Sequence, residues 1–243
     1  HRDLHSFPTR RSSDLLWIVA TIAILVTANL LVALGQLPTA VHYAVVPVAA
    51  VVLVVLARVS GLGWDDLGLA RSQIRPSLPY AAAAIGVVVA VVAAVVAVPA
   101  LRQFFLSEKY NAVLPALFAA GIVIPLHTVI PEELAFRGVL HGRLTHLLGV
   151  RYALFVGAFA FGLWHIASSR GLTGGNQGLS GVLGSGTFGQ IAGIVGAVVA
   201  TAVAGLVLSW LRHRSTSLIA PIALHWALNA TGAVAAAAAW QFA

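Results

Sequence analysis

Long apolar segments are the feature of this sequence that most restricts its fold. A helix that crosses the hydrocarbon core of a bilayer needs about 20 predominantly apolar residues. The chain offers about seven such segments, and most of the short connections between them contain Pro, Gly or charge. We expect the segments near residues 16–35, 41–58, 79–100, 113–140, 151–168, 189–210 and 216–240. With 60% hydrophobic and 9% charged residues, the sequence predicts an all-α, polytopic transmembrane helical bundle of about seven spans.

The first fifteen residues do not belong to this pattern. They spell HRDLHSFPTRRSSDL, which matches one reading frame of a common sequencing adapter. We interpret residues 1–15 as a non-native tail and residues 16–243 as the transmembrane domain. On this interpretation the native N-terminus is missing, and an eighth span could have been lost with it. A short basic cytoplasmic tail is the alternative.

The charges indicate how the helices cross the membrane. The net charge of +7 comes from single arginines scattered between apolar runs, which form no basic face for a nucleic acid. Basic residues favour cytoplasmic loops, so the distribution puts the N-terminus in the cytoplasm and the C-terminus outside. The cytoplasmic set is Arg58, Arg71, Arg75, Arg143, Arg151, Arg212 and Arg214, and the opposite set is Arg102, Lys109 and Arg170. Cysteine is absent, which excludes disulfides, a thiolate nucleophile and Cys-ligated metals.

Two adjacent acidic residues lie where lipid should exclude them. Glu132 and Glu133 are inside the fourth apolar segment. An unpaired intramembrane charge costs about 2.5 kcal/mol or more, so such residues by default face protein or water at a functional site. Arg137 follows Glu133 by four residues, the spacing and order of a favourable helical ion pair. We interpret Glu133 and Arg137 as a mainly structural pair. Because a helix turns about 100° per residue, we expect Glu132 to have a different partner.

Polar residues of two further segments are placed to meet Glu132. His165 lies four residues after Phe161 on one helix face. His225 and Asn229 have the same spacing in the last segment. Counted from the expected cytoplasmic ends, Glu132, His165 and His225 all lie about 15 to 21 Å deep at about 1.5 Å per residue. Buried polar groups in a membrane need partners. We therefore predict one site near the bilayer centre where these residues converge.

These residues carry a resemblance to a known family. PEELAFRG is similar to the EExxxR motif of the CPBP intramembrane proteases, FGLWH to their FxxxH motif and HWALN to their HxxxN motif. That family includes type II CAAX prenyl endopeptidases and bacteriocin-processing or immunity proteins. The resemblance covers about residues 113–232, which we expect to form the catalytic core. It implies an intramembrane endopeptidase of a bacterial cytoplasmic membrane, with an active site open to the cytoplasm and a peptide or lipidated protein as substrate.

The resemblance also implies a role for each site residue. Glu132 and His165 would activate a water molecule. His225 and Asn229 would stabilise the oxyanion on the scissile carbonyl, an interaction worth several kcal/mol in a water-poor site. Glu133, Arg137 and Phe161 would support them. The family is often described as metal-dependent, and Glu132, His165 and His225 offer the ligand types of an open zinc site. Because no HExxH is present, we prefer a glutamate-activated water, and one divalent metal stays open.

Competing interpretations use the same residues differently. Gly178-Leu179-Ser180-Gly181 spells the GxSG string of rhomboid serine proteases, with His225 as a base, but this leaves Glu132 unexplained. A channel, transporter or scaffold could use buried acids and histidines to relay ions or hold a partner. A non-catalytic bacteriocin-immunity protein is a further alternative. Membrane lipid and the substrate are the expected partners, and nucleic acid is not.

A few other residues are interpreted as packing or as parts of the site's surroundings. Small residues recur at every fourth position of the sixth segment, which predicts close helix packing on that face: Gly189, Gly193, Ala197, Thr201 and Gly205. Trp164 and Trp226 adjoin motif residues and either line a groove for an apolar substrate or pack helices together. His141 follows Arg137 by four residues, and we prefer a loop or interface histidine to one that lines the cytoplasmic mouth.

Overall fold

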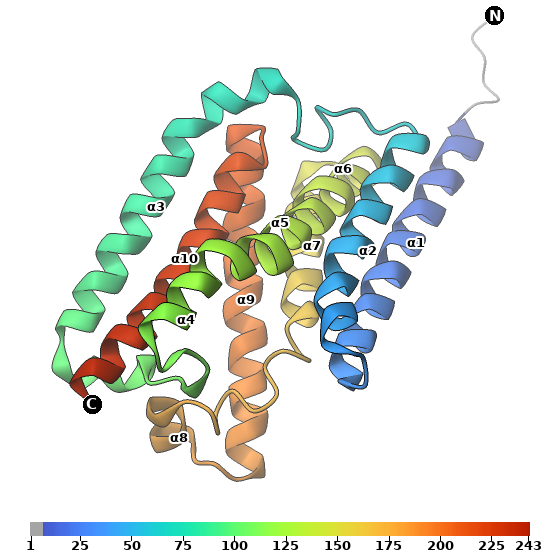
Figure 1. The fold of residues 1–243 in the computed structure, drawn as a ribbon. Coiled ribbons are helices and arrows are strands. Elements are labelled where there is room, and N and C mark those ends of the chain that lie inside the picture. Colours follow the sequence, from blue (N-terminus) through green and yellow to red (C-terminus); the bar gives the residue numbers. More distant parts are fainter. Residues whose placement is uncertain (1–6) are drawn as a thin grey trace, which may run out of the picture.

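The computed structural model describes residues 7–243, and the regular elements in this part of the chain are helices (Figure 1). Outside the fourth apolar segment, the α-helices are α1 (Phe7–Leu34), α2 (Thr39–Val59), α3 (Ile74–Ala97), α7 (Val150–Trp164), α8 (Gln177–Leu183), α9 (Thr187–Ser215) and α10 (Ile219–Ala239). Short 3-10 turns occupy Arg71–Gln73, Pro99–Phe105, Glu108–Tyr110 and Trp240–Phe242. The predicted all-α helical bundle is confirmed.

Six helices within the described residues are long and apolar enough to cross a bilayer. They cover Ser13–Leu34, Thr39–Val59, Arg71–Ala97, Val113–Leu148, Thr187–Ser215 and Ile219–Phe242. The remaining predicted segment, 151–168, forms the 15-residue helix α7, which is about 22 Å long and ends at Trp164. At the end of α7, polar side chains bond to the backbone of the preceding turn. His165 Nδ1 lies 2.8 Å from Phe161 O, and Ser169 Oγ donates to His165 O at 2.7 Å. Such bonds compete with the helical ones.

The predicted non-native tail falls partly outside the described residues. Residues 1–6 lie outside them, whereas residues 7–15 continue into the first helix as part of α1. Asp14 pairs with Arg143, with 3.4 Å between Oδ1 and Nη1. The origin of the tail stays a prediction.

The fourth apolar segment is one long helix with two widened stretches. It runs through α4 (Val113–Phe118), a π-helical stretch η4 (Ala119–Val129), α5 (Ile130–Glu133), a second π-helical stretch η5 (Leu134–Leu140) and α6 (His141–Leu148). Pro125 and Pro131 lack the N–H that an α-helix would use here. π-Helical turns occur frequently at functional sites. The two acidic residues lie in the short α-helical turn between the two widened stretches.

The helices pack in pairs around this segment (Figure 1). α3 packs along α10, α7 along α9, and α1 along α2. The largest buried apolar cluster joins α1, α2, η5, α7 and α9, and its bulkiest members include Leu53, Phe136, Leu140, Phe161 and Leu208. Many large apolar side chains on the outer faces are exposed, as a lipid-facing surface requires, and the protein is an integral membrane protein.

Small residues let α7 and α9 approach closely, and Gly205 of the predicted small-residue stripe lies at this contact. A Cβ added to Gly205 would lie 3.1 Å from the Phe161 ring and 3.2 Å from the Cα of Ala158. A Cβ added to Gly162 would lie 2.8 Å from the Val198 carbonyl oxygen. Gly193 is buried against Thr173 in the same way. The interpretation of the stripe as packing is confirmed.

The two basic sets of the sequence lie at opposite ends of the bundle. The start of α1, the connection between α2 and α3, and the end of α9 share one end, while α8 and the end of α10 lie at the other (Figure 1). We call the first the basic end, because it carries Arg58, Arg71, Arg75, Arg143, Arg151, Arg212 and Arg214. Its loops are held together by Arg212, whose Nη2 donates to the carbonyl oxygens of Asp65 and Asp66 at 3.2 and 2.9 Å.

Candidate active site

Three acidic and imidazole side chains meet between the middle of the fourth segment and the first half of α10. Glu132 and Glu133 are 6% and 0% exposed, and His225 is 5% exposed. The Nδ1 atom of His225 lies 2.8 Å from Glu133 Oε1, and its Nε2 atom lies 3.9 Å from Glu132 Oε2. The predicted convergence of the fourth and last segments on one site is thus present in the structure.

Besides His225, Glu133 contacts Arg137, the partner that the sequence predicted. Arg137 Nη1 donates to Glu133 Oε1 at 3.1 Å, so the helical ion pair is confirmed. Arg137 is 1% exposed, donates from Nη2 to Gly205 O at 3.3 Å, and lies over the Phe161 ring with 3.9 Å between Cζ and the ring centroid. The guanidinium therefore ties Glu133 to α9 and to the aromatic residue of the FxxxH motif.

Glu132 has a hydrogen-bond partner different from Arg137, as expected, because it accepts from Trp164, but the two glutamates also share His225. Both approach His225, because an imidazole ring offers two nitrogens on different edges and each glutamate meets one of them. The helical rotation of about 100° between the glutamates fits this arrangement instead of preventing it.

Trp164 holds the other oxygen of Glu132. Its Nε1 donates to Glu132 Oε1 at 3.0 Å, while Glu132 Oε2 is buried and has no hydrogen-bond partner among the described residues. Trp164 therefore contacts the site through this hydrogen bond. The single signal in the sequence was that an indole N–H inside a membrane segment needs an acceptor. The identity of that acceptor, 32 residues away, was not readable from the sequence.

His165 and Asn229 lie near this group, but not in direct polar contact with it. The polar contacts of Glu132 and His225 with the described residues involve neither of them. His165 packs edge-on against Phe161, with 4.6 Å between ring centroids, and Phe161 packs in the same way on His225 at 5.7 Å. Asn229 lies one turn beyond His225 and lines a cavity of 590 Å³.

The cavity that Asn229 lines is formed mainly by connections at the end opposite to the basic end. Its lining includes Phe104, Lys109, Tyr110, Arg170 and Asn176. A second, apolar cavity of 190 Å³ lies between α1, η5 and α7, and its lining includes Leu25, Asn29, Phe136, Leu163 and Trp164. Asn229 thus borders a polar cavity and Trp164 an apolar one, while neither cavity is lined by Glu132 or His225.

Neither the serine alternative nor a metal site is formed by the described residues. Ser180 lies on α8, and its hydroxyl donates to Gln177 O at 3.0 Å. The polar contacts of His225 among residues 7–243 are to Glu132 and Glu133. No group of three or more His, Asp or Glu side chains in this part of the chain could hold a metal ion. Glu132, His165 and His225 in particular do not come together as one set of ligands among the described residues.

The comparisons with known proteins agree with these motifs. Residues 110–231 match the family described as type II CAAX prenyl endopeptidase Rce1-like. No curated protein and no solved structure gave a significant match. The matched region is half of the chain and holds Glu132, Glu133, Arg137, Phe161, His165, His225 and Asn229. The chain belongs to the type II CAAX prenyl endopeptidase Rce1-like family, a family of intramembrane endopeptidases.

Proposed function

We propose that this protein hydrolyses a peptide bond with a water molecule activated by Glu132. One observation carries the proposal: Glu132 Oε2 is buried, lacks a hydrogen bond from the described residues, and lies 3.9 Å from His225 Nε2. Two polar atoms that each bond to the same water at about 2.8 Å lie about 4 Å apart. The separation therefore suits one water between carboxylate and imidazole. Trp164 fixes the other carboxylate oxygen and so orients the base.

The reaction follows from these positions. Glu132 Oε2 takes a proton from the water while the hydroxide oxygen bonds to the scissile carbonyl carbon. The carbonyl oxygen becomes an oxyanion, which accepts hydrogen bonds from His225 Nε2–H and the Asn229 amide. The C–N bond then breaks and the proton on Glu132 passes to the leaving nitrogen, giving an acid and an amine. Glu133, held by Arg137, keeps the His225 ring oriented through Nδ1.

His165 completes the site from the end of α7. Its ring lies against Phe161, which in turn contacts His225, so a small closure around a bound peptide would bring His165 to the water. Catalytic hydrogen bonds are often long in an unliganded enzyme and shorten when substrate binds. We assign His165 to water positioning together with Glu132, and Phe161 to the support of both imidazoles.

The two cavities near the site suit a peptide substrate that has an apolar part. The apolar cavity beside Trp164 lies next to the base, and the cavity beside Asn229 offers polar and aromatic contacts to a peptide chain. A membrane-associated or lipidated protein substrate would thus place its apolar part between α1 and α7 and its backbone along α10. This substrate class agrees with the description of the family as type II CAAX prenyl endopeptidase Rce1-like.

The test is cleavage of a membrane-tethered CAAX-type reporter in proteoliposomes. Glu132→Gln should lower turnover about 100-fold or more, because it removes the base while keeping the acceptor for the Trp164 N–H. Asn229→Ala should lower it about 100- to 1,000-fold through loss of an oxyanion donor. Ser180→Ala is the control and should leave turnover unchanged. Activity that survives Glu132→Gln but not Ser180→Ala would replace this mechanism with the serine one. No turnover by the unaltered protein would favour a scaffold or immunity role.

A further inference from the structure

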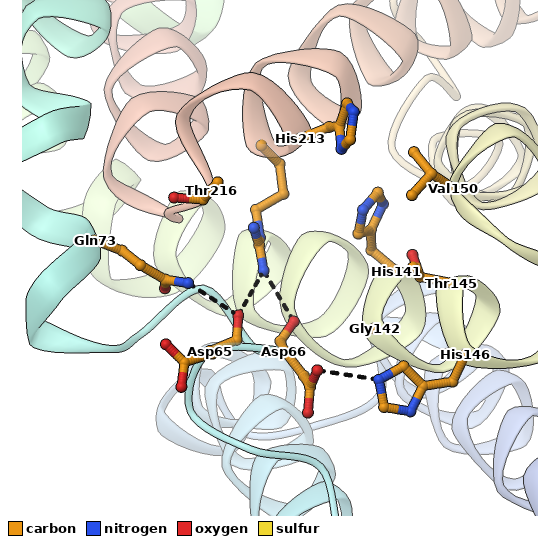
Figure 2. A pocket seen from close by; sticks show the side chains of 11 residues that line it. Asp65, Asp66, Gln73, His141, Gly142, Thr145, His146, Val150, His213 and Thr216 are labelled. Atoms are coloured by element: carbon orange, nitrogen blue, oxygen red, sulfur yellow. Dashed lines mark hydrogen bonds and ion pairs between the residues drawn. The ribbon is translucent and has the colours of Figure 1, made fainter.

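Another polar cavity, distinct from the one beside Asn229, has a volume of 220 Å³ and lies at the basic end of the bundle (Figure 2). It is enclosed by α6, the start of α7, the end of α9 and the connection between α2 and α3. Its lining includes neither Glu132 nor His225, so it is separate from the proposed catalytic group. The side chains that matter for the argument are Asp65, Asp66, His141, Thr145, Arg212 and His213.

Arg212 is a buried cation without a carboxylate partner. It is 6% exposed, and among the described residues no carboxylate lies within ion-pair distance of it. Its Nη2 is held by the backbone carbonyls of Asp65 and Asp66, while its Nε is buried and unpartnered within the described part of the chain. Asp66 acts on Arg212 only from beyond ion-pair distance. A buried charge without a direct partner is unfavourable, so this arrangement favours an anion in the cavity.

Two further polar side chains point to the same ligand. His141 is 6% exposed and begins α6, so it is not a loop histidine, and it lines this separate cavity. Its Nδ1 has no partner among the described residues, and neither does Thr145 Oγ1, one helical turn further along α6. Together with Arg212, three residues that line the cavity each carry a buried, donor-capable atom without a partner in the described part of the chain.

The acidic residues of the lining do not fill this role. Asp66 accepts from Gly63 N at 2.7 Å through Oδ2 and lies 3.0 Å from His146 Nε2 through Oδ1. In Figure 2 the carboxylates of Asp65 and Asp66 point away from His141 and His213. Gln73 Oε1 is also buried without a partner in the described residues, which gives the cavity one acceptor for a hydroxyl.

The connection between α2 and α3 is shaped to keep Arg212 in place. Gly68 has a φ of +71°, and a Cβ added there would lie 2.5 Å from Arg212 Nε and 2.7 Å from Cζ. The guanidinium thus lies directly on a backbone position that only glycine suits. Such a close fit holds the guanidinium of Arg212 against this connection.

We propose that this cavity binds a phosphate group, held by Arg212, His141 and Thr145. At about 30 Å³ per water molecule, it has room for about seven water-sized groups, enough for a phosphate and part of an attached glycerol. Arg212 lies three residues before the end of α9, which places the cavity at the depth of lipid headgroups. Basic pockets between transmembrane helices commonly bind anionic headgroups. A phospholipid or free phosphate would supply the same chemistry.

The experiment measures binding to the detergent-solubilised full chain and needs no proteolysis, so it is independent of the proposed catalytic function. Native mass spectrometry would follow retention of phosphatidylglycerol against phosphatidylcholine, with inorganic phosphate as a competitor. Arg212→Gln should weaken phosphatidylglycerol retention roughly 10- to 100-fold. Arg214→Gln is the matched control, because Arg214 is an exposed arginine of the same helix end, and it should change retention about twofold or less.

Each outcome decides the proposal. Retention of phosphatidylglycerol that phosphate does not displace identifies a lipid headgroup, and binding of phosphate alone identifies the free ion. If neither probe binds, or if Arg212→Gln and Arg214→Gln weaken binding equally, the cavity is not a phosphate site. Should Arg212→Gln fail to fold, Thr145→Val decides instead. It removes only a hydroxyl and should weaken binding roughly 3- to 10-fold, and unchanged binding overturns the proposal.

Discussion

At the scale of residues, the two nitrogens of His225 organise the candidate site. One edge of the ring is held by Glu133 at 2.8 Å, and the other faces Glu132 at 3.9 Å. The tighter contact belongs to the glutamate that is also paired with Arg137, and the looser one to the glutamate with an unpartnered oxygen. In the proposed mechanism the adjacent acids therefore have different roles: Glu133 positions the ring, and Glu132 acts on water.

This division predicts that removal of Arg137 damages the fold before the chemistry. Arg137→Leu leaves Glu133 buried beside His225 without its counter-ion, which costs about 3 to 5 kcal/mol. Thermal unfolding in detergent should show a lower midpoint than for the unaltered chain. Arg151→Leu, which removes an exposed arginine at the start of α7, is the control and should leave the midpoint almost unchanged. Equal effects of the two substitutions would show that the buried pair does not stabilise the fold.

Trp164 is predicted to be a positioning residue. Trp164→Phe keeps an aromatic ring in the apolar cavity but removes the N–H that holds Glu132 Oε1. One lost hydrogen bond to a carboxylate, worth about 1.5 to 3 kcal/mol, should lower kcat roughly 10-fold or more. The KM should change little, because the substrate is not the bonding partner. A rise in KM at constant kcat would instead show that Trp164 contacts substrate.

At the scale of elements, the close contact between α7 and α9 determines where Phe161 lies. Gly162→Ala adds a methyl group 2.8 Å from both Val198 O and the Ala202 Cβ, and a shift is needed to relieve it. Overpacking of this kind costs about 1 to 3 kcal/mol, so unfolding should occur at lower temperature and turnover should fall as Phe161 moves. Gly196→Ala on α9 is the matched control, since nothing lies within 4 Å of its added Cβ. Destabilisation by both variants alike would contradict the packing argument.

The connection between α2 and α3 has its own dependence on pH. Burial opposes ionisation of Asp66, but the Gly63 N–H, His146 and Arg212 outweigh it and lower the pKa of Asp66 below 3.8. A depressed carboxyl pKa stabilises the fold above the unfolded value and loses that contribution as pH falls through the folded one. Asp66→Asn should therefore lower the unfolding temperature at about pH 7 and have little effect near pH 3. An equal effect at both pH values would rule out this electrostatic contribution.

Local patterns predicted some of these elements better than others. The Glu133 and Arg137 pair and the small-residue stripe follow from helical spacing alone, and both are confirmed. The end of α7 at Trp164 was not predicted, because it depends on side-chain bonds of His165 and Ser169 to the backbone within an apolar run. The widening of the fourth segment around its two prolines was not predicted in its extent either.

At the scale of the whole molecule, hydropathy and charge were sufficient for the bundle and for its two ends. They were not sufficient for contacts between distant segments. Trp164 reaches Glu132 across 32 residues, and Arg212 reaches the connection before α3 across 146 and 147 residues. Such contacts depend on which helices become neighbours, which apolar runs of similar length do not encode individually. The assignment of the catalytic roles stays a prediction for the same reason.

The absence of cysteine allows a direct test of which end faces the cytoplasm. Each introduced cysteine is unique, so Arg214→Cys at the basic end and Arg170→Cys at the opposite end report their sides independently. In intact bacterial cells a membrane-impermeant maleimide should label Arg170→Cys and should label Arg214→Cys only after the membrane is opened, because basic loops are retained in the cytoplasm. With the basic end in the cytoplasm, the cavity beside Asn229, which Arg170 lines, would open on the outer side, against the expectation of an active site open to the cytoplasm. Labelling of Arg214→Cys in intact cells would invert the predicted orientation, and the substrate peptide would then reach Asn229 from the cytoplasmic side.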